Sequence, residues 1–248
     1  MKLGVSYNVF DGTENLRKSI ERIRGSVDFI SVVCQEKSYY GNIIKEEDKK
    51  NVYDLLNDGL INCVYWSENK EYKSPLLNEI NKRNIGLRLS KKNGCTHHIS
   101  MDCDEIYCQY QFEKAKKIAN KYDTTFCGLV TYYGDGEHVF EVPEDYFVSF
   151  IFRIDERMFE RIVKYPLRVD PSRKVFPKNY FIFERENLEM QHYSWIRNDI
   201  RWKLENSSAR INHNDTKIEK IVNYYNNWNG ELMALTYNGY VKLKKIKI

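Results

Sequence analysis

The sequence has no apolar run long enough to cross a membrane and no paired cysteine motif. Its first ten residues, MKLGVSYNVF, form a strand pattern without the sustained apolar core of a signal peptide or a membrane anchor. The six cysteines show no C-x-x-C spacing, and most lie in apolar runs, where a reduced thiol packs as a small hydrophobic group. These absences predict a protein of the reducing cytoplasm.

The chain also has little excess charge, since 39 basic and 35 acidic residues leave a formal net charge of +4. So small a charge, spread along 248 residues, argues against a nucleic-acid partner. Only the C-terminal eight residues are locally basic, with Lys242, Lys244, Lys245 and Lys247. Two interpretations stay open: solvated lysines on an edge strand, or peripheral contact with an anionic membrane surface.

No linker rich in proline, glycine and serine divides the sequence, which contains 5 prolines and 12 glycines. Its length suits one large α/β domain with a full core. We therefore expect a single domain over 1–248, made of a first half (1–106), a second half (107–205) and a C-terminal appendage (206–248).

Strand and helix patterns alternate through the first part of the chain. Apolar strand patterns at 2–7, 29–34 and 61–66 are separated by two helical patterns, the first capped by Thr13 and ended by Gly25, the second ended by Gly59. This alternation predicts a parallel α/β layer.

The second part has a mixed pattern. We expect a helix over 112–122, a strand over 124–132, an extended segment over 139–154 and a short helix capped by Asp155. Ser194 is expected to start a helix that continues to Leu204, and a further helix covers 218–225. Asn238-Gly239 between two apolar runs predicts a hairpin.

The most informative stretch runs from Ser74 to Glu105. Ser74-Pro75 is a helix start, Asn93-Gly94 ends that helix, and 96–101 reads as a short strand. The strand delivers Asp102, Asp104 and Glu105 to its carboxyl end, where an open α/β sheet binds its ligand. Carboxylate oxygens there suit a hard divalent cation that holds a diphosphate.

The neighbouring cysteines and histidines raise the question of a zinc site. Because consecutive residues of a strand face opposite ways, His97 and His98 do not converge, which argues against it.

The motif residues resemble the nucleotide-sugar half of glycosyltransferases with the GT-A fold, especially those of family 2. The resemblance is carried by Arg83-Asn84, Gly86, Gly94 and Asp102-Cys103-Asp104-Glu105. It implies an α/β fold with a mostly parallel central sheet flanked by helices, followed here by the helical and hairpin appendage. Residues 1–106 would bind the nucleotide-sugar and 107–205 would form the acceptor side.

The same resemblance implies the site residues. A Mn2+ or Mg2+ ion would bridge the donor diphosphate, held by Asp104, Asp102 and a later histidine, His192, while Arg197 could help close the site. The side chains expected to line the donor site are Tyr7, Asn8, Phe10, Gln35, Arg83, Asn84, Asp102 and Asp104. Gln35 departs from the family pattern, which has an acid at this point, so the identity of the base is left open.

An inverting enzyme also needs a carboxylate base. We expect Asp170 in this role, with Glu184 as the next candidate; Asp145 and Asp155 compete with them. Asp170 also has an ordinary explanation, because Asp-Pro commonly opens a turn.

The predicted function is metal-dependent transfer of a sugar from a nucleotide-diphosphate donor, a UDP-sugar by preference, to a glycan or another acceptor, with inversion. The alternatives are a sugar nucleotidyltransferase and a non-catalytic nucleotide-sugar-binding protein. The first would need a glycine-rich, arginine-containing phosphate loop after the first strand, which SYNVFDGT lacks. A two-metal nuclease would need more converging carboxylates and a basic track.

Overall fold

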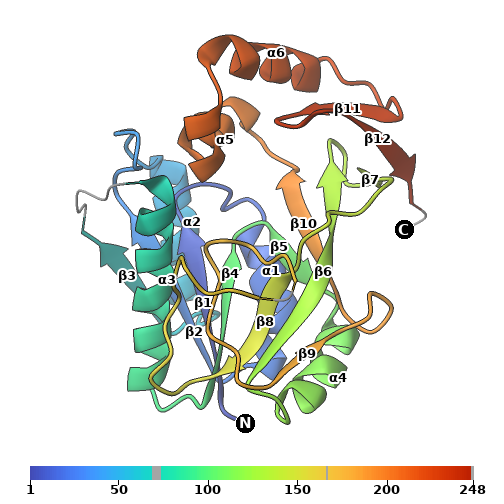
Figure 1. Cartoon of the computed structure of the whole chain (residues 1–248). Coiled ribbons are helices and arrows are strands. Elements are labelled where there is room, and N and C mark those ends of the chain that lie inside the picture. The colour runs from blue at the N-terminus through green and yellow to red at the C-terminus, as the bar shows by residue number, and fades with distance from the viewer. Residues whose placement is uncertain (69–73, 166, 247–248) are drawn as a thin grey trace.

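A computed structural model describes residues 1–68, 74–165 and 167–246. Its centre is a parallel sheet of four strands in the order β3-β2-β1-β4 (Figure 1). These strands are β1 (Leu3–Val9), β2 (Phe29–Gln35), β3 (Cys63–Ser67) and β4 (His97–Asp102). β1 and β2 are buried along their whole length, as expected for strands covered on both faces.

The sheet continues past β4 with mixed pairing. β8 (Val148–Arg153) is antiparallel to β4 and to β6 (Thr124–Tyr133), and β6 is followed by β7 (His138–Phe140). β10 (Glu189–Trp195) lies parallel to β6 and antiparallel to the short β5 (Glu105–Tyr107), and β9 (Tyr180–Ile182) also pairs with β6. β10 therefore brings a late segment of the chain beside the strand that follows the D-x-D acids.

Helices cover both faces of the central strands. α1 (Leu16–Ile23), α2 (Glu46–Asn57) and α4 (Gln109–Ala119) bury their apolar residues in the main core, on the face that β1 presents with Tyr7. A 3-10 turn, Arg24–Ser26, ends α1. α3 (Pro75–Lys92) lies along β1 and β2 on the opposite face.

α3 approaches the sheet closely because of a glycine. A Cβ at Gly86 would overlap the hydroxyl of Ser6 on β1, so only glycine fits at this crossing. The predicted ends of α3 are confirmed: the Ser74 hydroxyl accepts a hydrogen bond from Leu77 N at 3.3 Å, and Gly94 has a φ of +72°. The helix thus positions its first turns at the carboxyl ends of β1 and β2.

The C-terminal appendage forms a cap above that edge of the sheet (Figure 1). The cap also includes α5 (Ile200–Asn206), which precedes the appendage; the appendage itself contains a 3-10 turn (Ser208–Asn212), α6 (Asp215–Asn226) and the hairpin β11 (Met233–Thr236) and β12 (Gly239–Lys245). A second apolar cluster around Tyr133, Trp195, Leu204 and Ile221 joins the cap to β6 and β10. The predicted hairpin is confirmed, and β12 pairs with β7.

Three local predictions are wrong. Asp155 caps no helix: its carboxylate accepts from Arg157 N and Nε, and the segment up to residue 165 has no helix. Residues 189–195 form β10, so the helix expected from Ser194 begins at Ile200, capped by Asp199. The Thr13 hydroxyl donates to Asp48 at 2.5 Å and caps no helix.

The predicted fold class, a mostly parallel central sheet flanked by helices with a helical and hairpin appendage, is confirmed. The division at 106 and 205 stays a prediction. In the described residues, no helix combines the length and the apolarity that a membrane span requires. Of the basic C-terminal residues, Lys242, Lys244 and Lys245 lie on β12, whereas Lys247 lies outside the described residues.

A buried histidine under α3 predicts acid sensitivity. His98 is fully buried on β4, with Nδ1 2.9 Å from Ser90 Oγ and Nε2 3.4 Å from Ser6 Oγ, and burial lowers its pKa to about 3. Because the unfolded chain has the ordinary value of about 6.5, it binds a proton first as the pH falls, and stability is lost below that value. From pH 7.5 to 5.0 we expect His98 to reduce the free energy of unfolding by about 2 kcal/mol.

Urea unfolding at the two pH values tests this expectation. His98→Asn lacks the titrating group, so its stability should change less between pH 7.5 and 5.0 than that of the unmodified protein. An equal change in both proteins would show that His98 does not carry the effect.

Candidate functional site

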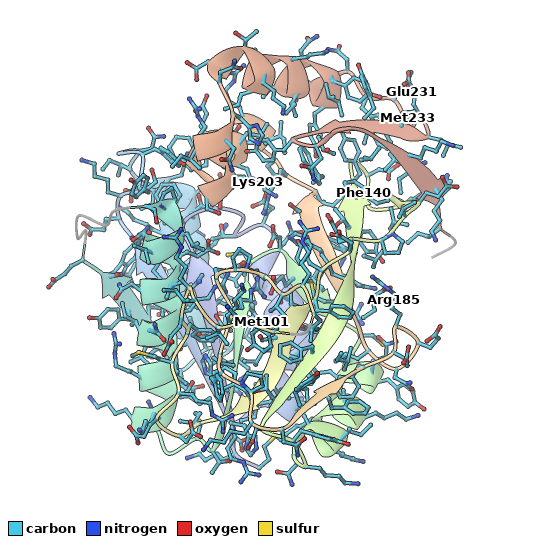
Figure 2. All side chains as sticks on the ribbon, in the orientation of Figure 1. Met101, Phe140, Arg185, Lys203, Glu231 and Met233 are labelled. Atoms are coloured by element: carbon cyan, nitrogen blue, oxygen red, sulfur yellow. The ribbon has the colours of Figure 1, made fainter. Side chains whose placement is uncertain are left out.

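A cavity of about 390 Å³ lies at the carboxyl ends of β1, β2 and β4, beneath the cap. α3 forms one wall with Asn78, Glu79 and Lys82, and the α5 region forms another with Arg197 and Lys203. This volume lies within the range of small-molecule sites, and the position is where open α/β sheets bind ligands. Lys203 extends from α5 into the space between the cap and the sheet (Figure 2).

Amide groups line the part of the cavity between β1, β2 and α3. Gln35 and Asn78 exchange two hydrogen bonds, with Nε2 donating to Oδ1 at 2.7 Å and Nδ2 donating to Oε1 at 2.9 Å. Asn8 is 7% exposed, and among the described residues neither its Nδ2 nor its Oδ1 has a hydrogen-bond partner. A buried amide that lacks both partners is costly, so Asn8 is available to a ligand.

Phe10 closes the cavity beside these amides. Its ring stacks on Trp202 of α5, with ring centroids 6.0 Å apart and an interplanar angle of 17°. The contact ties the loop after β1 to the cap.

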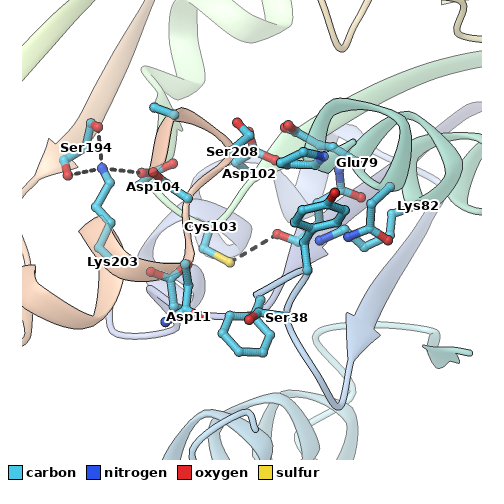
Figure 3. Close-up of a pocket in the computed structure, with 18 of the residues that line it drawn as sticks. Asp11, Ser38, Glu79, Lys82, Asp102, Cys103, Asp104, Ser194, Lys203 and Ser208 are labelled. Atoms are coloured by element: carbon cyan, nitrogen blue, oxygen red, sulfur yellow. Dashed lines mark hydrogen bonds and ion pairs between the residues drawn. The ribbon is translucent and has the colours of Figure 1, made fainter. Parts of the chain in front are cut away.

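The two acids of the D-x-D motif both line the cavity (Figure 3). Protein cations hold both acids. Asp102 Oδ2 lies 2.9 Å from Arg83 Nη2 and 2.6 Å from Arg173 Nη2. Asp104 Oδ2 accepts from Arg197 Nη2 and lies 3.7 Å from Lys203 Nζ.

Burial and the neighbouring charges change the pKa values of Asp104, His192 and Lys203. Burial alone would raise the pKa of Asp104, but Arg197, His192 and Lys203 together hold it well below its ordinary value. Burial lowers the pKa of Lys203 to about 8, aided by the nearby Arg197 and opposed by Asp104. Burial also lowers the pKa of His192 to about 4, so this imidazole is neutral at pH 7. The site therefore keeps charged acids and cations together.

The side chains as they lie do not fit the predicted divalent cation. His192 Nε2 is 3.8 Å from Asp104 Oδ2, so two of the three predicted ligands meet, but Asp102 is turned onto Arg83 and Arg173. Arg197 Nη2 donates to Asp104 Oδ2, so this oxygen already has a cationic partner. Within the described residues, no three His, Cys, Asp or Glu side chains converge to hold a metal ion.

The structure places five predicted residues outside this cavity: Asp170, which lines a second cavity described below, and four others. Tyr7 points to the opposite face of β1, where its hydroxyl lies 2.9 Å from Ser19 Oγ, because neighbouring strand residues alternate and Asn8 faces the cavity. Asn84 uses its amide on the backbone of Phe159. Arg83 is fully buried behind Asp102, and Glu184 lies in the exposed turn after β9.

A second cavity of about 290 Å³ adjoins the first and shares Glu79, Tyr146 and Ser208 with it. Asp170 lines this second cavity. Its Oδ1 accepts from Ser172 N and Oγ, both at 2.8 Å, and its Oδ2 lies 3.1 Å from Arg173 Nε. The arrangement holds a carboxylate in a fixed position in the wall of the second cavity.

Several residues of the site were not recognised from the sequence: Asn78, Glu79 and Lys82 on α3, Arg173 beside Asp102, and Lys203 on α5. Arg173 is three residues beyond Asp170 in the loop that was read only for its Asp-Pro turn. Lys203 is on a helix whose start was placed too early. Neither Arg173 nor Lys203 lies in a local pattern that distinguishes it from a surface residue, because the acids that they meet in the site, Glu105 and Asp104, are distant in sequence.

No protein-family model matches the chain, and no curated protein matches its sequence. Among solved structures, S. aureus TarS 1–349 in complex with UDP-GlcNAc is similar, with 11% identity, a TM-score of 0.49, and 78% of this chain and 59% of that chain covered. A second structure of S. aureus TarS 1–349 also has a TM-score of 0.49 and 11% identity, over 92% of this chain and 71% of that one. GalNAc-T7 with UDP, GalNAc and Mn2+ matches at 13% identity and a TM-score of 0.46, over 77% of this chain and 44% of that one.

This chain thus spans less than two thirds of the first of these proteins. At TM-scores below 0.5, the likeness adds nothing to what the cavity itself indicates.

Proposed function

We propose that this protein is a glycosyltransferase that takes a sugar from a nucleotide-diphosphate donor bound in the first cavity. The observation that carries the proposal is one cavity that brings together two kinds of polar group. It is lined by buried amides, including Asn8, whose side chain has no hydrogen-bond partner among the described residues, and by cations around the D-x-D acids. Such a cavity matches a ligand that joins a hydrogen-bonding base to a diphosphate.

The amides support a uracil base. An asparagine side chain offers one donor beside one acceptor, which complements the N–H and carbonyl edge of uracil. We therefore propose a UDP-sugar as the donor, in agreement with the motif resemblance.

The second cavity supports an acceptor beside the donor. We propose that Asp170 removes the proton from the attacking hydroxyl group, in an inverting transfer. Glu79 lines both cavities and is the competing carboxylate. A glycan acceptor, a cytoplasmic location and membrane contact through the lysines of β12 stay predictions.

A nucleotide screen tests the donor site. A ligand that binds only the folded state stabilises it by about 2.7 kcal/mol at a hundredfold excess over its Kd, so UDP is expected to raise the melting temperature more than GDP, CDP or ADP. The screen is run with EDTA and, separately, with Mn2+. If no nucleotide stabilises the protein under either condition, the donor site is refuted.

A non-catalytic nucleotide-sugar-binding protein is the second candidate, because cations already hold both acids of the motif. Turnover separates the two functions. A glycosyltransferase releases UDP from its UDP-sugar, at least slowly to water, whereas a binding protein would be stabilised by the donor without releasing UDP.

A further inference from the structure

Arg197 has hydrogen-bonding capacity that its protein contacts leave unused. Its side chain is 5% exposed, and one nitrogen, Nη2, donates to Asp104. Nε and Nη1 are buried without a hydrogen-bond partner among the described residues. Buried donors of a charged group are costly when they are unpaired, so this guanidinium is suited to an anion in the cavity that it lines.

The backbone next to Arg197 makes room for it. Gly12, in the loop after β1, has a φ of +76°, and a Cβ there would overlap the guanidinium at Nη1. Glycine therefore allows Arg197 to lie against the loop after β1.

Lys203, on α5, is a second cation that lines the same cavity as Arg197. Its ammonium donates to Ser194 O and Oγ and lies 3.7 Å from Asp104 Oδ2, while its side chain is 13% exposed in the cavity wall (Figure 3). Asp104 carries one negative charge against these two cations. Asp11, the other carboxyl beside the two cations, has its pKa raised by burial, which favours its neutral form, so the cations face the cavity with little opposing charge.

We propose that Arg197 and Lys203 bind the diphosphate of the donor directly and take the place of the divalent cation. The inference rests on the proposed function and specifies how that site stabilises its leaving group. In the transfer, the bond from the anomeric carbon to the diphosphate oxygen breaks and UDP leaves with the electron pair. The acceptor hydroxyl forms the new bond and gives its proton to Asp170. Charged hydrogen bonds from the two cations stabilise the charge on the departing phosphate.

The unmodified protein provides the first test. UDP is titrated calorimetrically into the protein in EDTA and, separately, in Mn2+. We expect Kd values within about threefold of each other, since the side chains already supply the charge. Binding at least about tenfold tighter with Mn2+ would overturn the inference but leave the donor site standing, whereas no binding of any nucleotide under either condition would refute the proposed function itself.

Substitutions on α5 and in the segment just before it give the second test. Arg197→Met and Lys203→Met are each expected to weaken UDP binding in EDTA about tenfold to a hundredfold, because each removes charged hydrogen bonds to the phosphates. Arg201→Met is the matched control: Arg201 lies on the outer side of α5, bound to Glu219, and its loss should leave binding unchanged.

Uridine separates phosphate contacts from a general loss of folding. It shares the base and ribose but lacks the diphosphate, so its affinity should be the same in all variants. If Arg197→Met binds UDP as well as the unmodified protein does, or binds it better once Mn2+ is added, Arg197 occupies the place of the metal and the inference is wrong.

Discussion

Replacing Arg173 by methionine is expected to lower the free energy of unfolding by about 3–5 kcal/mol. Arg173 is 3% exposed and contacts both oxygens of Glu105, which is 1% exposed, as well as Asp102. Without the guanidinium, a buried carboxylate loses its counter-charge in a place that water does not reach. Urea unfolding at pH 7.5 measures the loss.

Two further variants show whether the cause is the unpaired charge. Arg168→Met changes an exposed arginine of the same loop, bound to the exposed Asp145, and should change stability by less than about 1 kcal/mol. The double variant Arg173→Met with Glu105→Gln removes the stranded charge and should regain part of the loss. Equal stability of the Arg173 and Arg168 variants would contradict this account.

Asp170→Asn is expected to reduce turnover about 10²-fold to 10⁴-fold, because the amide cannot accept the proton of the attacking hydroxyl. The measurement is the initial rate of UDP release from the UDP-sugar that the protein prefers. Asp170 lines the second cavity and not the first, so the affinity for UDP should be retained. That split between rate and binding distinguishes a base from a residue that shapes the donor site.

Glu79→Gln is the matched comparison. Glu79 Oε1 accepts from Arg83 and from Ser172, so its loss should affect the order of the site more than the chemical step. A larger fall in turnover for Glu79→Gln than for Asp170→Asn, at unchanged affinity for UDP, would transfer the role of base to Glu79.

Local signals in the sequence predicted the architecture where local physics decides it. Ser74-Pro75 and Gly94 define α3 correctly, because capping and positive φ depend on nearby residues alone. The buried β1 and β2 were visible as apolar runs. The D-x-D acids were predicted at the end of β4 because the short strand pattern that precedes them is also a local signal.

The errors fall where distant contacts decide the structure. Asn84 on α3 binds the backbone of Phe159 through both amide atoms, which holds the segment after Asp155 in an irregular path despite its helical apolar spacing. Residues 189–195 pair with both β5 and β6 and so form a strand, although the sequence predicted that a helix begins at Ser194. The cations that hold the acids could not be found either, because Arg173 meets Glu105 across 68 positions of sequence.

Hydrogen bonds between residues far apart in the sequence hold the cap to the loop after β1. Asn15 Nδ2 donates to Ile196 O at 3.0 Å across 181 positions, and Asn198 N donates to Glu14 Oε1 at 3.1 Å across 184 positions. Closing loops of that length is entropically costly and slow compared with pairing neighbouring strands. During synthesis the parallel strands can assemble early, whereas the cap can close on the loop after β1 only once residues 196–198 have left the ribosome.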